Sequence, residues 1–599
     1  MKGDFMSRTV AYKGYANAVR RFDAEPSPGR QRNRFNYAKK RLMTFDAGYL
    51  VPFFWMPCLP GDSLKIRTRA LVRASNAFVA PLMDEIWVSF YFFKTYNRFV
   101  FVDWNAFMGE LIQDDPDYDD SGTNNGGKSL TRQPFNSPDE YVLPTMIIKP
   151  GSDGLPAFPV HSLLDQLALP YAVGNDGYEI QTLLPRHCNL IYNEYFRDEN
   201  LQDFAPVPKG IGSDAISMYQ LMPSTKYADY FTGSLPFLQK GPSVNIGLVG
   251  DIPVVPDGLT LGLTDGVNNF GLIYSSDGNR LLAHSNDYGL PAGSAIASGS
   301  SNPKVNTTIG PASSTGYKAQ LSSADYISLA QVRLGFQMQR FYEGQARSGT
   351  RYIEYIRFMF DEFIPDVQLL RPEFIGGGKM LLNVNPVAQT SADSTTPLGT
   401  LGAFGVRFDD KIFAQTHCNE HGYIIGFLTI STTLTYQQGL NRDFSRRDRF
   451  DFYTPTLAHL AEQAVLNKEV CCTGLSDYDN DVFGYIGRYD EYRTMHGEVT
   501  GYFRSNAMIP GTTTKVSLDA YHLSQFWDVS NPGSSTDNYP GLPHLNSEFL
   551  VQPKNVIDRA LGITSDAPGV PQFLGDIVTT VKGSRVISKY GIPGFADHF

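Results

Sequence analysis

The chain has 599 residues, of which 19% are charged and 13% aromatic, and its formal net charge is −10. The 55 glycines and 38 prolines that accompany these aromatic residues are typical of β-strands joined by long ordered loops. An intrinsically disordered chain is excluded, because disorder requires low hydrophobicity and high net charge.

The cysteines are few and odd in number, so we expect no disulfide framework. The first 22 residues contain no apolar stretch of signal-peptide length. The longest apolar runs, such as residues 86–93, are far too short to span a bilayer. We therefore expect a protein that folds in a reducing cytoplasm. Its cysteines are Cys58, Cys188, Cys418, Cys471 and Cys472.

A basic arm is predicted over residues 1–43. The first 41 residues contain eleven lysines and arginines against three acidic residues, which gives this segment a charge of +8 and the remainder −18. A basic arm on an acidic body is a candidate nucleic-acid contact, and Phe22, Phe35 and Tyr37 can stack on bases. A solvated terminal tail is the alternative. The candidate DNA-binding residues are Arg20, Arg21, Arg30, Arg32, Arg34, Lys39, Lys40 and Arg41.

Three strands are predicted directly after the arm. The first covers residues 48–54, "GYLVPFF". Residues 63–72 alternate as in a strand with one buried face. One side carries Leu64, Ile66, Thr68, Ala70 and Val72, and the other carries Lys65, Arg67 and Arg69. Residues 85–93 form a continuous apolar run, which indicates a strand buried on both faces.

The stretch "GTNNGGKS", residues 122–129, matches the P-loop pattern G-x-x-x-x-G-K-[ST]. A working P-loop follows a buried strand and opens a helix. Here an acidic run precedes the match, and Pro134 and Pro138 interrupt any helix after it. We interpret the stretch as a polar surface loop without nucleotide affinity.

The acidic run before that loop resembles a calcium-binding loop, with Asp115, Asp117 and Asp119 at alternate positions. It departs from the EF-hand because Asp120 stands where the invariant glycine belongs and Gly126 where the bidentate glutamate belongs. The three aspartates remain candidate divalent-ion ligands, but an acidic solvated loop fits better, and no metal or other cofactor is predicted.

Residues 241–318 differ from the rest of the chain. They are rich in Gly, Ser, Asn and Pro and contain only eight charged residues. Loops of this length are uncommon in compact domains and usually carry a function.

Two helices and several late strands are predicted. Residues 324–342 place apolar side chains at helical spacing, and residues 454–469 begin with Thr454 as N-cap and Pro455 at the first helical position. Strands are expected within residues 422–436, 498–503 and 515–523.

The C-terminal third contains two clusters with chemical potential. His417, Cys418 and His421 resemble half a zinc site, but no second ligand pair stands out, and adjacent cysteines 471 and 472 are too close to chelate together. The segment 442–453 interleaves arginines with aromatic and acidic residues. Arginine–aspartate pairing at an inter-subunit interface explains it at least as well as DNA contact. Its arginines are Arg442, Arg446, Arg447 and Arg449.

No catalytic set is recognisable, since the sequence contains neither a G-x-S-x-G elbow nor an HExxH motif. We therefore predict a protein that is not an enzyme. The plentiful carboxylates leave one alternative open, a carbohydrate-active or carbohydrate-binding β-sandwich protein.

The predicted strands lie near the two ends of the chain, with a large middle section between them. This arrangement predicts one β-sandwich that is closed by segments far apart in the sequence. The predicted fold is mainly β: a single eight-stranded antiparallel jelly roll with large loop insertions and a few short helices. The expected organisation is an arm (1–43), the first jelly-roll strands with inserted loops (44–240), an insertion (241–318), and helices with the remaining strands and a C-terminal extension (319–599).

Several long blocks of the sequence resemble the major capsid proteins of gokushoviruses, small single-stranded DNA phages of the Microviridae. They include "TFDAGYLVPFFWMPCLPGDSLKI" at residues 44–66, "CNLIYNEYFRDENLQ" at 188–202 and "LTYQQGLNRDFSRRDRFDFY" at 434–453. The blocks keep the family's order between about residue 40 and residue 550. The basic stretch "RRFDAEPSPGRQRNRF" has no clear counterpart in the family.

The resemblance implies a viral capsid jelly roll, sixty copies of which form a T=1 icosahedral shell around a circular single-stranded DNA genome. Implied partners are an internal scaffolding protein, a small basic DNA-binding protein, a minor pilot protein and a host cell-surface receptor. The protein is expected in the virion, assembled in the host bacterial cytoplasm.

The resemblance also places the insertion 241–318 at the three-fold axes. We expect it to form an outer spike for host attachment, because exposed loops on rigid scaffolds commonly carry binding. One copy of this segment has too little core to fold alone. Three copies meeting at an axis can bury a common apolar core. The residues expected in that core are Leu248, Val254, Val255, Leu259, Leu261 and Leu263.

Overall fold

The computed structural model describes most of the chain. Described are residues 32–108, 143–150, 155–172, 174, 176–242, 244, five short strands between 254 and 319, and residues 329–388, 390, 401–458, 462–506, 508–510, 512–525, 527, 541–563 and 569–589. The chain forms two compact units, one made of Met1–Leu238 with Ala346–Phe599 and the other of Gln239–Gln345.

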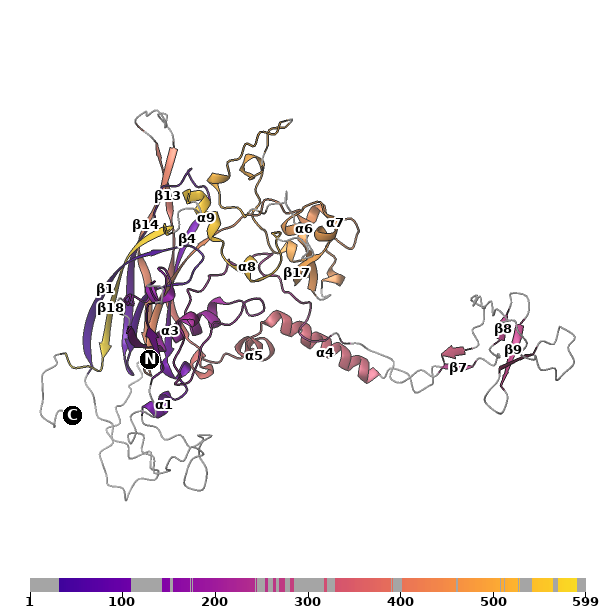
Figure 1. Ribbon diagram of the computed structural model, residues 1–599, viewed down its shortest axis with the longest axis horizontal. Coiled ribbons are helices and arrows are strands. Elements are labelled where there is room, and N and C mark those ends of the chain that lie inside the picture. The colour runs from indigo at the N-terminus through magenta and orange to yellow at the C-terminus, as the bar shows by residue number, and fades with distance from the viewer. Residues whose placement is uncertain are drawn as a thin grey trace, which may run out of the picture. The chain divides into compact units, whose positions relative to one another are not determined.

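The larger unit is built on one long antiparallel sheet that folds over itself into two layers of four strands (Figure 1). One layer has the order β1–β18–β3–β14 and the other the order β12–β4–β15–β2, with β13 attached to β14. The eight-stranded jelly roll predicted from the sequence is thereby confirmed. The strands are β1 (Asn33–Phe45), β18 (Phe573–Arg585), β3 (Ser63–Ala74), β14 (Leu401–His417), β12 (Glu373–Leu381), β4 (Ile86–Tyr96), β15 (Gly422–Thr432), β2 (Val51–Cys58) and β13 (Asn383–Ala388).

The two layers are joined by hydrogen-bonded pairing at one short corner. There β12 pairs with β14 only at Gly376↔Ala414 and Gly377↔Phe413. Gly376 has φ +145°, and a Cβ on it would lie 2.6 Å from the carbonyl oxygen of Phe413. A Cβ on Gly377 would lie 2.1 Å from the carbonyl oxygen of Phe90. Glycine is therefore required where the backbones approach most closely.

The predicted alternation of residues 63–72 is confirmed by β3, whose side chains are alternately exposed and buried along its whole length. The apolar run 85–93 is also confirmed as a strand, β4, buried on both faces. Phe90 and Phe92 point into the core between the layers, whereas Phe93 belongs to a second core on the other side of the strand.

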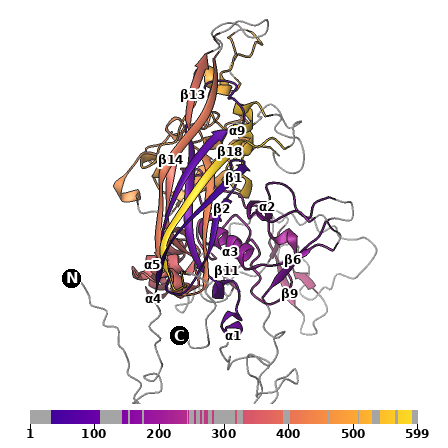
Figure 2. The same cartoon turned by 90° about the vertical axis from the view of Figure 1, so that its left-hand side faces the viewer.

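The second core lies against the outer face of the β12–β4–β15–β2 layer. It is formed by α2 (Leu163–Gln166), α3 (Leu183–Ile191) and the hairpin of β5 (Thr145–Ile148) and β6 (Tyr178–Gln181), and Figure 2 shows α2 and α3 beside β2. At one end of the jelly roll, α9 (Lys554–Leu561) packs its buried residues into the core between the layers. Other short helices are α1 (Trp104–Phe107), α7 (Ser476–Asp479) and α8 (Ser547–Leu550).

Two helix predictions had different outcomes. Residues 329–342 are helical as predicted, within α4 (Leu329–Ser348), and α5 (Tyr352–Phe360) follows. The helix predicted over 454–469 is wrong. Only Pro455–Leu457 forms a 3₁₀ turn, and the chain then enters β16 (Glu462–Leu466) and the short α6 (Asn467–Val470). Gln463 and Val465 are buried at alternate positions because β16 pairs with β17 (Val482–Gly487).

The later strand predictions are only partly correct. β15 confirms the strand expected from residue 422, but 498–503 and 515–523 are not strands. Each contributes one isolated bridge and then a 3₁₀ turn, Gly501–Phe503 and Asp519–Tyr521 respectively. The missing jelly-roll strands come instead from β12, β14 and β18.

The sheet begins earlier than the predicted arm boundary at residue 43. Residues 33–45 form β1, which pairs with β18 along its whole length, from Asn33↔Arg585 to Phe45↔Phe573. The described part of the arm is therefore an integral strand of the jelly roll.

Among the described residues of the smaller unit, five short strands are present. β8 (Gly262–Thr264), β9 (Asn269–Tyr274) and β10 (Leu281–His284) form one sheet, and β7 (Val254–Pro256) pairs with β11 (Tyr317–Ala319). The first 17 residues of α4 also belong to this unit.

A buried ion pair fixes α3 to the following loop. Both side chains are almost fully buried, at 0% exposure for Arg186 and 2% for Asp214, and two 2.7 Å hydrogen bonds join them. Tyr219 donates a further hydrogen bond to Asp214. Burial raises the pKa of Asp214, but the hydrogen bonds from Arg186, Thr182 and Tyr219 outweigh it, so the net pKa lies below its ordinary value.

Asp214→Asn should lower the free energy of unfolding by about 3–5 kcal/mol at neutral pH, because Arg186 is left as a buried charge without its partner. Urea unfolding of the unassembled chain measures this.

Tyr219→Phe, which removes one hydrogen bond to the carboxylate, should lower the free energy of unfolding by about 1.5–3 kcal/mol. Because the folded pKa of Asp214 is lowered, its contribution is lost as pH falls through that pKa, so the gap between wild type and Asp214→Asn should close in acid. A gap that is independent of pH would contradict this account.

Candidate nucleic-acid and inter-subunit surfaces

The predicted DNA-binding residues do not form one cluster. Arg20, Arg21 and Arg30 lie outside the described residues, and Arg32 is exposed just before β1. The four that lie on β1 alternate between its two sides, and we describe each side in turn.

Lys39 and Arg41 lie on the side of β1 that carries the buried Phe45, although Lys39 itself is exposed. The ammonium group of Lys39 stands 4.4 Å from the centre of the Trp55 ring. Arg41 donates to the backbone oxygens of Phe53 and Gln166. Burial lowers the pKa of Arg41, and its hydrogen bonds hold β1 against β2 and α2. Its role in the fold is therefore structural.

Arg34 and Lys40 lie on the opposite, exposed side of β1, where they join basic residues of the neighbouring strands. The pairing register sets Lys40 opposite Val578 and Val578 opposite Arg69, and sets Lys582 opposite Lys65. We call this surface the outer basic face. It consists of Arg34, Lys40, Lys65, Arg67, Arg69, Arg73 and Lys582, all exposed.

Few acidic groups neutralise the outer basic face. Asp576 pairs with Lys40 at 3.1 Å and Asp410 with Arg67 at 2.6 Å. On β14, Phe413 lies opposite Arg67 and Phe408 opposite Leu71, with 49% and 60% of their surface exposed. Cations beside exposed aromatic rings are the combination that binds single-stranded nucleic acid. The alternation of basic residues in β3 was visible in the sequence, but β18 was not predicted as its neighbour.

The arginine-rich segment 442–453 pairs largely with acids of its own chain. Arg442 lies 3.2 Å from Glu469, and Arg446 lies 2.6 Å from Asp443. Arg447 and Arg449 are exposed, and Arg449 stacks over Phe450. The prediction that these arginines contact another subunit now rests mainly on the two exposed ones.

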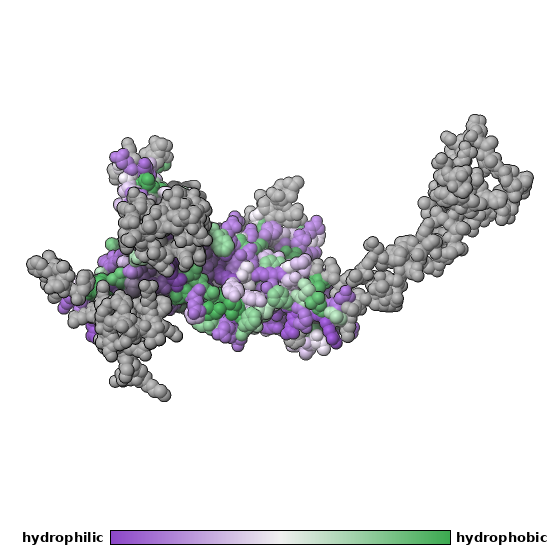
Figure 3. Space-filling view, turned by 90° about the horizontal axis from the view of Figure 1, so that it is seen from below, coloured by the Kyte–Doolittle hydropathy of each residue, from purple (hydrophilic) through white to green (hydrophobic). Residues whose placement is uncertain are grey.

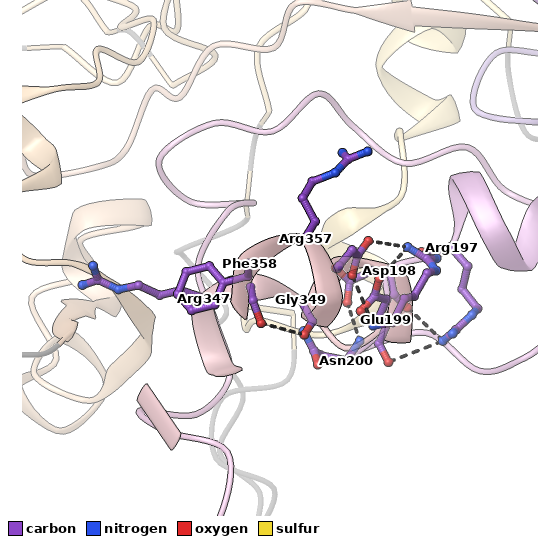
Figure 4. A pocket seen from close by; sticks show the side chains of 11 residues that line it. Arg197, Asp198, Glu199, Asn200, Arg347, Gly349, Arg357 and Phe358 are labelled. Carbon is purple, nitrogen blue, oxygen red and sulfur yellow. Dashed lines mark hydrogen bonds and ion pairs between the residues drawn. The ribbon is translucent and has the colours of Figure 1, made fainter. Parts of the chain in front are cut away.

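A pocket of the larger unit with a volume of about 590 Å³ lies at the start of α5 (Figure 4). Arg351 joins its walls by donating to Glu199 and to the backbone oxygens of Asn193 and Arg197. Figure 4 shows Arg197, Asp198 and Glu199 grouped together, whereas Arg347 extends away from them. The guanidinium of Arg351 is already hydrogen-bonded within the chain, so it is not available to bind a ligand in this pocket.

Two carboxyl groups of this pocket share a hydrogen bond. Burial and the neighbouring Glu199 raise the pKa of Glu354. For Glu199, the hydrogen bond from Glu354 and the charge of Arg351 outweigh burial, so its pKa is lowered. Glu354 also accepts the backbone N–H of Arg351, which caps α5. The opposite shifts mean that Glu354 takes up a proton before Glu199 as the pH falls, and the pair links two elements that are far apart in sequence.

The half zinc site is not assembled. His417 lies at the exposed end of β14 and bonds the hydroxyl of Ser63, whereas Cys418 is buried beside Cys58. Within the described ranges, no group of three His, Cys, Asp or Glu residues is arranged for a metal ion. The loop 122–129 and the acidic residues Asp115, Asp117 and Asp119 lie outside the described residues. No helix in the described part of the chain has the length and apolarity to cross a membrane.

The residues expected in the three-fold core are only partly described. Val254 and Val255 lie on β7, opposite Ala319 and Lys318 of β11, and Leu263 lies on β8 opposite Phe270 of β9. Leu248, Leu259 and Leu261 lie outside the described residues.

Comparison with known proteins identifies the family. The model of the phage capsid protein (F protein) family matches residues 26–595. The capsid protein VP1 of Chlamydia phage 1 is 33% identical over 96% of this chain and 97% of that relative. VP1 of Bdellovibrio phage phiMH2K is 34% identical, with the same coverage, and VP1 of Spiroplasma virus 4 is 29% identical over 94% and 95%. The gokushovirus resemblance of the sequence is thus confirmed, and the chain belongs to the phage capsid protein (F protein) family.

Proposed function

We propose that sixty copies of this capsid protein form a T=1 icosahedral shell around a circular single-stranded DNA genome. The proposal is carried by the family match over nearly the whole jelly roll. Large apolar side chains exposed on its surface support it, because a shell subunit covers such residues with its neighbours. Figure 3 shows hydrophobic patches among hydrophilic ones on one face, and Leu42, Met83, Phe444 and Met495 are among the exposed residues.

The alternative of a carbohydrate-active or carbohydrate-binding sandwich has no support in the comparisons, all of which name capsid proteins. The role of the chain is structural. Further proposed partners are an internal scaffolding protein, a small basic DNA-binding protein, a minor pilot protein and a host receptor. The proposed site of assembly is the host bacterial cytoplasm, and the final location is the virion.

The charge balance supports a separate basic protein. Sixty arms of about +8 provide about 480 positive charges, whereas the gene for 599 residues alone requires about 1,800 phosphates. The arms neutralise less than a third of that minimum, so other cations must accompany the DNA.

Assembly is tested by expressing the chain together with the phage's other structural genes. Electron cryomicroscopy of the purified particles should show a T=1 shell with one jelly roll per asymmetric unit. A larger lattice, or particles whose shell is built from another protein, would overturn the proposal.

We propose that the outer basic face contacts the packaged DNA. Arg69→Gln combined with Lys582→Gln should lower the salt concentration at which particles release DNA, because each cation that contacts a phosphate contributes about one unit to the salt dependence. Lys149→Gln combined with Lys515→Gln is the matched control, since both lysines are exposed and lie outside this face. Equal salt tolerance of the two double variants would place the DNA contacts elsewhere.

We propose that residues 241–318 form an outer three-fold spike used in host attachment. Replacing them with a short Gly-Ser linker should leave the jelly roll folded, because this segment belongs to a separate compact unit. Circular dichroism should show a retained β spectrum, while attachment of assembled particles to host cells should fall. Normal attachment, or a reconstruction with the segment on the inner surface, would contradict the spike.

A further inference from the structure

A second, smaller pocket of about 220 Å³ lies within the arginine-rich part of the larger unit. The segment 442–451 forms one wall, α6 and the end of β16 form another, and residues 488–491 after β17 complete it. We call it the arginine pocket. The residues used below are Ser445, Arg446, Phe450, Lys468 and Arg488.

Three buried donors of this pocket have no hydrogen-bond partner among the described residues. They are the hydroxyl of Ser445 and the Nε atoms of Arg446 and Arg488. The Arg446 side chain is only 10% exposed. Buried donors without acceptors cost free energy, and natural structures rarely leave several of them in one place. An acceptor that enters the pocket would satisfy them together.

The acids in the wall do not supply that acceptor. Glu469 accepts the backbone N–H of Leu466 and a hydrogen bond from Arg442. Glu491 accepts from Gln463, and its nearest distance to Arg446 is 3.8 Å, too long for a hydrogen bond. Asp451 accepts the backbone N–H groups of Arg447 and Asp448. All three carboxylates are thus oriented toward other donors.

The charges that line the pocket leave a surplus of one cation. Arg442, Arg446, Lys468 and Arg488 line the pocket with Asp451, Glu469 and Glu491. Asp443 pairs with Arg446 at 2.6 Å, but it lies outside the lining and is 65% exposed, so solvent screens its charge. A ligand with a single negative charge would balance this set. A phosphate monoester or free phosphate carries up to two charges near neutral pH and would exceed it.

We propose that the arginine pocket binds a phosphodiester group of a single-stranded nucleic acid. A phosphodiester carries one negative charge on two non-bridging oxygens, and these accept charge-assisted hydrogen bonds from arginine. Phe450, which lines the pocket and is 58% exposed, offers a ring for a neighbouring base. The identity of the polymer rests on the proposed function, because a shell around single-stranded DNA supplies phosphodiesters at high local concentration.

The test is equilibrium dialysis of the unassembled chain with trithymidylate that lacks terminal phosphates. Its two linkages are phosphodiesters, and it is too short to cover the outer basic face. The chain also carries Arg69→Gln and Lys582→Gln, so that binding at that face is reduced. Thymidine monophosphate and inorganic phosphate are measured in parallel to separate a phosphodiester site from a free-anion site.

In this background, Arg488→Gln should weaken trithymidylate binding about tenfold, the loss expected for hydrogen bonds to a charged group. Arg493→Gln is the matched control. Arg493 is exposed, pairs with Asp490 and does not line the pocket, so affinity should stay within about twofold. Ser445→Ala, which removes a neutral donor, should weaken binding in the same direction and serves if Arg488→Gln unfolds the chain.

Unchanged affinity in both Arg488→Gln and Ser445→Ala would overturn the proposal. Inorganic phosphate that binds as tightly as trithymidylate would identify a free-anion site and overturn the phosphodiester assignment. Displacement of trithymidylate by an acidic peptide at equal concentration would favour a protein segment as occupant. Shell assembly by the Arg488→Gln variant is measured separately, so a failure of the pocket does not count against the capsid function.

Discussion

The structure depends on burying the inner faces of two four-stranded layers against each other. Phe53, Phe90 and Phe92 meet edge to face in this core, and α9 closes one end of it. Because each strand has two faces, burial of the inner face leaves the outer face of each layer to be used differently. The β12–β4–β15–β2 layer is covered by a second core, whereas the β1–β18–β3 surface is exposed and basic. The asymmetry between the two layers separates a structural side from a candidate binding side.

Strands with a strong periodic signal could be predicted from the sequence. β3 alternates strictly, and β4 is apolar throughout because both of its faces are buried. β12 contains three successive glycines, which the corner of the sheet requires but which propensity disfavours in a strand. The helix expected over 454–469 was wrong although its apolar residues have helical spacing. Residues 462–466 pair with β17 and bury Gln463 and Val465 at alternate positions, so tertiary pairing overrides the local pattern.

The candidate surfaces were less predictable, since they depend on which strands become neighbours. The arm was predicted as one basic cluster, yet pairing with β18 sends Arg41 inward and Lys40 outward. The outer basic face needs Lys582, which lies more than five hundred residues after Lys65 in the chain. The arginine pocket also unites distant segments, and the sequence supplied only the half that contains Arg442 and Arg446.

The pairing of β1 with β18 has a consequence for synthesis. Phe573 and its partner Phe45 lie at opposite ends of the chain, and β18 also separates β1 from β3. At about 5–20 residues per second, a ribosome needs roughly half a minute to two minutes to make the intervening chain. During that time β1 has no partner strand on its β18 side, and the edge of β3 is open as well. The layer can close only at the end of translation, so newly made subunits pass through a period in which other nascent chains can pair with these edges.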